Sequence, residues 1–221
     1  AWLRRTQLVA TPKTKEKVTR LNQLLSLRAK LVKDCGGYKT RIKEMLDTEL
    51  ISKSDLIYKT QKAVITALNG NIQKVESEIE TLIETDPELK NNFDLIRTIK
   101  GVGKIVAARM LAVTSNFKKF SNARKFNCYA GLAPFKHESG TSIRGRSRVS
   151  HLANKEIKTV LNLAAFCAIR FNQELKLYYE KRVSEGMKRM SCINIIRAKI
   201  VGRIFAVVKR QTPYDAQTLA A

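Results

Sequence analysis

The first third of the chain carries two long segments with the hydrophobic periodicity of amphipathic helices. Apolar residues recur every 3.5 to 4 residues or so between about residues 15 and 50. A second run has apolar residues three or four apart, at Val64, Leu68, Ile72, Val75, Ile79 and Leu82. Asp86-Pro87 ends this run, because proline does not continue a helix. Two helices of about 30 residues joined by a short turn predict an antiparallel coiled-coil hairpin about 45 Å long.

Such an arm has little core of its own, which leaves two uses for its apolar stripe. The stripe can join copies of the chain into a homo-oligomer through the coiled coil, or the two helices can simply pack on a second domain. Gly36-Gly37 interrupts the first segment at about 1 kcal/mol per glycine, so we expect a kink or short break there. The stretch "ISKSD" that follows offers a helix cap at Ser52 or Ser54.

The remaining chain has the pattern of a compact, mainly α-helical domain with one basic loop. We expect helices near 91–98, 104–114, 121–130, 153–171, 173–185 and 190–210. The glycine- and serine-rich stretch 131–150 interrupts them, and "GTSIRGRSRVS" within it is compatible with a short hairpin. The expected organisation is a linker from a missing upstream domain over 1–14, a coiled-coil arm over 15–88 and a carboxy-terminal domain over 89–221.

The charge of the chain indicates a polyanionic partner. Forty-two Lys and Arg residues against 19 Asp and Glu give a net charge of +23 and a pI near 10.1, which favours nucleic acid over a small metabolite. No apolar run approaches the 18 to 20 residues or so that cross a bilayer, so we expect no membrane partner. The four cysteines are scattered and suggest neither a zinc site nor a disulfide framework. A bacterial cytoplasmic, nucleoid-associated protein fits these features.

The stretch "LIRTIKGVGKIVAARMLAV", residues 95–113, is a candidate helix-hairpin-helix motif. Its glycines permit a tight turn, and the following helix N-terminus presents free N–H groups that can hold a backbone phosphate. The alternative is a plain glycine corner between two helices. The residues expected to contact nucleic acid here are Lys100, Gly101, Gly103 and Lys104.

A second basic stretch, residues 116–135, combines aromatic residues with cations. The helix-like spacing of Phe117, Phe120, Phe126 and Tyr129 favours a core position over base stacking. The other face would be solvated in an ordinary helix, but the total charge favours contact with phosphates. Its cations are Lys118, Lys119, Arg124 and Lys125.

The stretch "HESGTSIRGRSR", residues 137–148, contains the most reactive candidate, Ser139. A serine can attack a phosphodiester when arginines neutralise the developing charge. Arg144, Arg146 and Arg148 alternate, so in an extended segment they would project from one face. From the residues alone, the pattern favours a serine-glycine turn in a basic loop over a nucleophile. His137 and His151 are each a possible general base or a surface residue, and no acidic set for two metals is visible.

Two stretches resemble the carboxy-terminal transposase domain of the insertion sequence one-ten family: "IKGVGKIVAARMLA" and "FSNARKFNCYAGLAPFKHESGTSIRGRSRVSHLANKEIKTVLNLAA". These proteins are bridge-RNA-guided recombinases related to pilin-gene invertases. The resemblance implies that Ser139, in the step Ser139-Gly140, is the nucleophile that links transiently to DNA. It also implies an amino-terminal RuvC-like domain that holds Mg²⁺ at a DEDD site, so no metal or other cofactor is expected on this chain. In "HLANKEIK", Ala153 stands where the family has glycine, ahead of the expected contacts Asn154 and Lys155.

The hypothesis that follows is a DNA transposase subunit acting on donor and target DNA, with a guide RNA as a further partner. One alternative is a non-catalytic helix-hairpin-helix module that binds DNA or RNA as an architectural dimer. Others are a site-specific DNA invertase of the same family and a domain that acts on DNA junctions during repair. The sequence identifies neither the target site nor the oligomer number.

Overall fold

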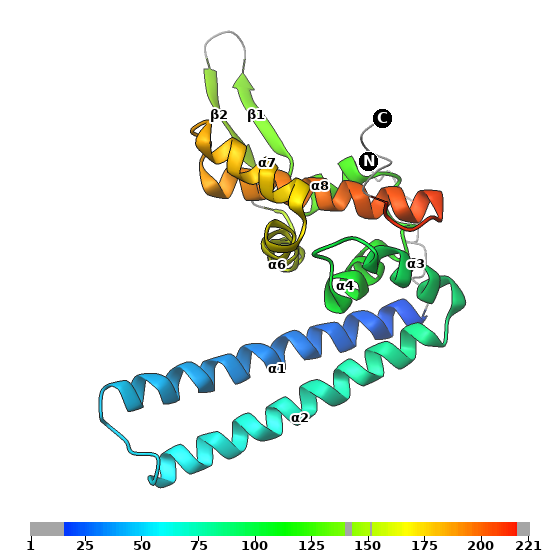
Figure 1. Ribbon diagram of the computed structural model, residues 1–221. Coiled ribbons are helices and arrows are strands. Elements are labelled where there is room, and N and C mark those ends of the chain that lie inside the picture. The colour runs from blue at the N-terminus through cyan, green and yellow to red at the C-terminus, as the bar shows by residue number, and fades with distance from the viewer. Residues whose placement is uncertain (1–15, 140–142, 151, 216–221) are drawn as a thin grey trace, which may run out of the picture.

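The computed structural model describes residues 16–139, 143–150 and 152–215, which form eight helices and a two-stranded antiparallel sheet (Figure 1). The prediction of a mainly α fold is confirmed. The elements are α1 (Glu16–Asp47), α2 (Leu56–Glu84), α3 (Pro87–Arg97), α4 (Lys104–Thr114), α5 (Ala123–Tyr129), β1 (Pro134–Ser139), β2 (Ile143–Val149), α6 (Lys155–Phe171), α7 (Gln173–Ser184) and α8 (Arg189–Arg210).

The helices α1 and α2 run antiparallel and project from the body as an arm (Figure 1). α1 continues through Gly36 and Gly37, so the expected break is wrong. A cost of about 1 kcal/mol per glycine is small beside the backbone bonds of a 32-residue helix and its packing on α2. The cap of α2 is Asp55, whose carboxylate accepts a hydrogen bond from the Ile57 N–H at 2.8 Å, in place of either expected serine.

The apolar stripe of the arm is divided between two clusters. Its outer part forms a small cluster of Cys35, Ile42 and Ile65. Its inner part, with Leu25 and Ile83 fully buried, belongs to the main core of the compact domain. The inner half of the arm is therefore packed on the compact domain of the same chain.

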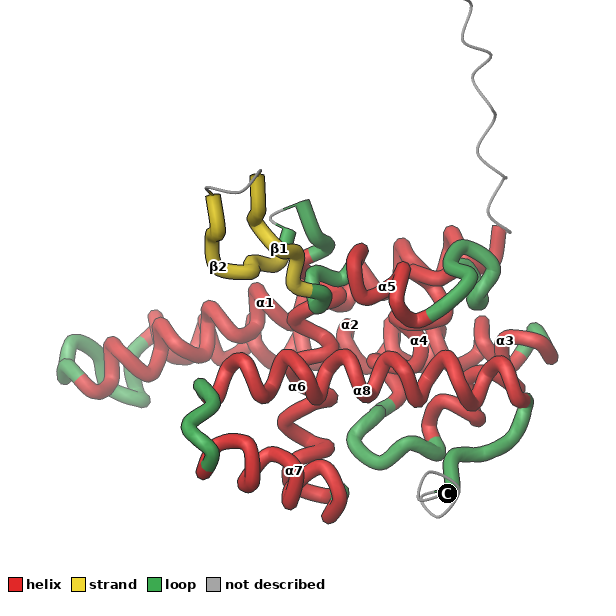
Figure 2. Tube along the Cα trace, turned by 90° about the horizontal axis from the view of Figure 1, so that it is seen from above, coloured by secondary structure: helices red, strands yellow, loops and turns green. Residues whose placement is uncertain are grey.

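The compact domain is organised around α8, which packs against α3, α5, α6 and α7 (Figure 2). Phe126 of α5 is fully buried, and its ring lies 5.7 Å from the ring of Phe205 on α8 and 5.2 Å from that of Phe120. These rings pack edge-on or tilted inside the domain, as the spacing of the aromatic residues predicts.

The strands β1 and β2 form a hairpin that stands out from the helical body (Figure 1). The stretch expected as a basic loop is thus largely extended structure. Pro134 pairs with Val149 at its base and Ser139 with Ile143 toward its tip. A register shift between Phe135 and His137 interrupts the ladder.

Candidate nucleic-acid interface

The turn between α3 and α4 is held tightly against α6. Gly101 has φ +98°, and a Cβ added there would lie 2.7 Å from the Cα, Cβ and N atoms of Ala168. Only glycine allows both this conformation and this approach. The glycine therefore has a packing role, and the phosphate-binding role of the turn stays a prediction.

The N-terminus of α4 has no capping side chain in its first turn. Gly103 is the exposed N-cap residue, and its carbonyl accepts the first intrahelical bond, from Ala107 N at 3.0 Å. Lys100 is exposed beside it. Lys104 instead reaches the arm, where its Nζ atom lies 2.6 Å from an Oε1 of Glu80. Of the two lysines expected to bind phosphate here, one is already paired with a carboxylate.

The cations around α5 have different surroundings. Lys118 forms an ion pair with Glu88 at 2.9 Å. The Nζ atom of Lys119 lies 5.3 Å from the centre of the Tyr129 ring, within the range of a cation–π contact. Arg124 and Lys125 are exposed on the helix surface. These last two are accessible to a phosphate, and their contact with nucleic acid stays a prediction.

The hairpin places the candidate nucleophile at its outer end. Ser139 is the last residue of β1, and Gly140 follows it outside the described residues. The three arginines Arg144, Arg146 and Arg148 are on β2. In the backbone register of the hairpin, Arg144 lies opposite Glu138 and Arg148 opposite Phe135. The register shift lies between these two pairs, so the backbone ladder is irregular between Arg144 and Arg148. The side chains of Ser139 and the three arginines lie outside the part that the structure describes, as does His151, so their roles stay predictions.

Asn154 begins α6 and ties it to α5. Its Oδ1 accepts from Ile157 N at 3.0 Å, and its Nδ2 donates to the Tyr129 hydroxyl at 2.9 Å. Ala153 fits against Gly131, where an added Cβ would lie 2.5 Å from the Ala153 methyl group. Asn154 is thus a structural cap, whereas the exposed Lys155 is free to face a ligand.

The predicted residues fall into two groups at opposite ends of α6. The end of α5, the hairpin base and Asn154 meet at the start of α6, where Asn154 N donates to the Tyr129 carbonyl at 3.0 Å. The turn at Gly101 lies against Ala168, near the end of α6. Asn154 and Ala168 are 14 residues apart along α6, which separates the two groups by roughly 21 Å. One short nucleic-acid segment therefore cannot contact all of the predicted residues at one point.

Two buried arginines were not among the predicted site residues. Arg109 is 6% exposed on α4, donates to the Leu25 carbonyl at 3.1 Å and lies 3.9 Å from a Glu156 oxygen. Arg197 is 4% exposed on α8. Burial lowers the pKa of each guanidinium below its ordinary value, although Glu156 partly offsets this for Arg109. The sequence carried one signal of their burial, because each arginine has apolar residues on both sides within its helical turn.

The described residues contain no group of three or more His, Cys, Asp or Glu side chains that could hold a metal ion. Among the helices of that same part of the chain, none is long and apolar enough to cross a membrane.

Residues 93–180 match the transposase IS116/IS110/IS902 family. The matched segment runs from α3 through the hairpin and α6 into α7. It therefore includes Ser139 and both groups of predicted contacts.

Three relatives show how the similarity extends along the chain. The pilin gene-inverting protein of Moraxella lacunata is 29% identical over 66% of this chain and 46% of its own length. The corresponding protein of Moraxella bovis is 28% identical over the same shares. A 43.6 kDa protein of insertion element IS110 from Streptomyces coelicolor is 24% identical over 74% of this chain and 39% of its own length. The chain spans less than half the length of these relatives.

Proposed function

Because residues 93–180 carry the domain of the transposase IS116/IS110/IS902 family, we propose that the chain acts in a DNA transposase or recombinase. The match to this family is the observation that carries the proposal. It is supported by the net charge of +23 and by the basic residues exposed around α5 and the start of α6. Two relatives are named for inverting a pilin gene, which is also a rearrangement of DNA.

In the proposed reaction, the hydroxyl oxygen of Ser139 attacks the phosphorus of a DNA phosphodiester. The new serine–phosphate bond forms as the bond to one deoxyribose oxygen breaks, and that oxygen leaves with a proton. Attack by the hydroxyl of an incoming strand then reverses the step and releases Ser139. Arg144, Arg146 and Arg148 would neutralise charge that develops on the phosphate oxygens. The position of Ser139 at the outer end of β1 supports access to a strand that lies over the hairpin.

The remaining parts of the proposal rest on the family resemblance. A RuvC-like domain, as the resemblance implies, would hold Mg²⁺ and supply the metal chemistry. A guide RNA would select the donor and target DNA. Leu50, Leu56 and Ile57 are exposed at the far end of the arm, which supports contact with another copy there.

The experiment is strand exchange between donor and target DNA, with the RuvC-like domain and the guide RNA supplied. Ser139→Ala is expected to abolish exchange and leave DNA affinity within about twofold, since a hydroxyl contributes little to binding a polyanion. Ser121→Ala, at an exposed serine before α5, is the matched control and should exchange strands normally.

Strand exchange by Ser139→Ala would reject the serine mechanism. If the charge-removing variant Arg144→Gln weakened DNA binding while Ser139→Ala had no effect on any reaction, the result would support a non-catalytic DNA- or RNA-binding module. If the products were only inversions between sites on one molecule, the protein would be a site-specific invertase.

A further inference from the structure

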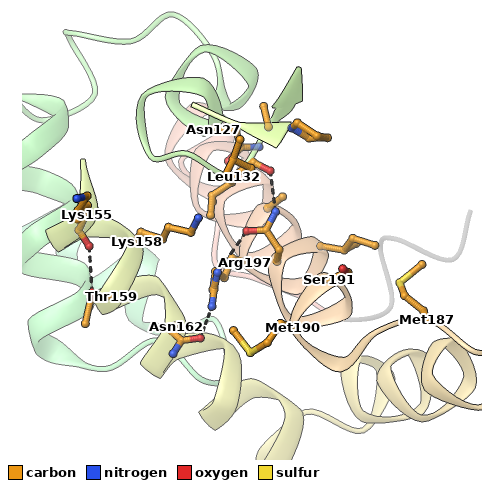
Figure 3. A pocket seen from close by; sticks show the side chains of 16 residues that line it. Asn127, Leu132, Lys155, Lys158, Thr159, Asn162, Met187, Met190, Ser191 and Arg197 are labelled. Atoms are coloured by element: carbon orange, nitrogen blue, oxygen red, sulfur yellow. Dashed lines mark hydrogen bonds between the residues drawn. The ribbon is translucent and has the colours of Figure 1, made fainter. Parts of the chain in front are cut away.

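A large cavity lies between α6, α8 and the base of the hairpin (Figure 3). Its volume is about 1060 Å³, at the upper end of the range for small-molecule sites. Pro134 and Val149, the first pair of the hairpin, line its edge, so the cavity is continuous with the element that carries Ser139. None of the residues expected from the sequence to contact nucleic acid line it, except Lys155.

The lining of the cavity is cationic. It includes Lys155, Lys158 and Arg197 but no carboxylate among its described residues. In Figure 3 the Lys158 side chain extends from α6 toward α8, the helix that carries Arg197. Arg197 lowers the pKa of Lys158, after the larger effect of burial, and burial lowers that of Arg197. The half-buried Lys158 and the buried Arg197 are close enough to repel each other, and the described lining has no carboxylate, which favours an anion beside them.

Among the described residues, the hydrogen-bond partners of the Arg197 guanidinium are all neutral groups. The guanidinium donates to the side-chain oxygens of Asn162 and Asn194, the second at 3.3 Å. Asn194 in turn donates to the Leu132 carbonyl at 2.8 Å, which fixes the position of both side chains. The arginine is thus oriented while its charge is left uncompensated by these partners.

Two polar atoms of the lining have no hydrogen-bond partner within the described structure. Arg197 Nε is a buried donor and Asn127 Oδ1 is a buried acceptor. Leaving such groups unpaired costs about 1 to 3 kcal/mol each.

Apart from Thr159 and Ser191, the rest of the lining is apolar. Leu132, Ile195, Met187 and Met190 form this part, and methionine adapts well to a planar aromatic group. The cations of the cavity can bind a phosphate, its apolar surface can bind a ring, and its amide groups can bind the polar edge of that ring. A nucleotide carries all three groups. We propose that this cavity holds one unstacked nucleotide of a nucleic-acid strand, with its phosphate between Lys158 and Arg197 and its base against Met187 and Met190.

This inference rests on the proposed function in one respect, that the ligand is a nucleic acid. It does not depend on the serine chemistry. DNA and RNA share the necessary groups, so the two sources are separated by experiment. The probes are fluorescein-labelled oligothymidylate and oligouridylate of about 15 nucleotides, and a fully paired DNA duplex of the same length. Affinity is measured by fluorescence anisotropy as a function of salt, on the full chain.

Two variants test the cavity by different means. Lys158→Gln removes one cation, and Ser191→Trp fills the cavity from its exposed rim without a change of charge. Each is expected to weaken single-strand binding about tenfold or more, with duplex binding nearly unchanged. Lys158→Gln should also reduce the salt slope by about 0.7, the value for one phosphate on a single strand. Lys62→Gln, an exposed lysine on the arm, controls for net charge and should have little effect.

The probe that binds more tightly identifies the source of the nucleotide as DNA or RNA. The proposal is overturned if Ser191→Trp binds single strands normally, if both variants weaken duplex binding equally, or if no single strand binds. Thermal melting of each variant shows that it is folded. Ser139→Ala should keep full single-strand binding, so failure of the cavity and failure of the serine mechanism give different results.

Discussion

The α3–α4 turn provides the sharpest test of the packing, through the substitution Gly101→Ala. Gly101 has φ +98°, a conformation that residues with a Cβ atom rarely adopt. The new methyl carbon would lie 2.7 Å from the Cα, Cβ and N atoms of Ala168. Two of these atoms are backbone of α6, so they cannot move away as a flexible side chain would.

The expected loss of stability has two contributions. Holding alanine at positive φ costs roughly 1 to 2 kcal/mol, and inserting a methyl group into a packed contact costs roughly 1 to 3 kcal/mol. Together they give about 2 to 5 kcal/mol. For a chain of this size, that lowers the melting temperature by about 4 to 20 °C.

Urea unfolding followed by circular dichroism measures this change directly. Gly36→Ala is the control, because it lies inside α1 with nothing within 4 Å of an added Cβ, and it should stabilise by about 0.5 to 1 kcal/mol. Adding Ala168→Gly to Gly101→Ala should restore only part of the loss, since the Ala168 Cα and N contacts remain. A Gly101→Ala protein as stable as the parent would refute the close approach of the turn to α6.

Three further changes test other parts of the structure. Asn154→Ala removes the cap of α6 and its bond to a tyrosine hydroxyl, so it should lower the unfolding free energy by about 1 to 2 kcal/mol in urea titrations. Leu25→Ala, in the part of the arm that joins the main core, should cost about 2 to 5 kcal/mol by the same measurement. Burial raises the pKa of the Cys192 thiol, so less of this thiol is present as the reactive thiolate near pH 8. Iodoacetamide at that pH should therefore label the exposed Cys167 first and Cys192 only after unfolding. Mass spectrometry of the peptides measures both labelling rates. Equal labelling rates in the folded protein would contradict the burial of Cys192.

Hydrophobic patterning predicted the helices well, because α6 and α8 each bury one stripe of their residues and α4 is buried on almost every side. The positions of α4, α6 and α8 follow the expected ranges closely. The continuity of α1 through Gly36-Gly37 was missed, since glycine propensity is a weak local effect that packing over a long helix overrides. The inner half of the arm joins the main core, a tertiary fact that no local pattern contains.

The candidate site was predictable only in part, because spacing along the chain does not give distance in space. The sequence identified the basic residues, but it could not show that Lys104 reaches Glu80 or that Asn154 serves as a cap. Nor could it show that α6 separates the Gly101 turn from the hairpin base. The cavity around Arg197 depends on residues from α5, α6 and α8 that become neighbours only in the folded chain.

The central claim, that Ser139 forms a covalent bond to DNA, is tested most directly by trapping that bond. A suicide DNA substrate, nicked so that the cleaved strand diffuses away, is incubated with the protein and the RuvC-like domain, and the adduct is digested and located by mass spectrometry. We expect a nucleotide attached to the peptide containing Ser139, and no adduct in Ser139→Ala at unchanged DNA occupancy. DNA cleavage without an adduct, or an adduct on another residue, would contradict it.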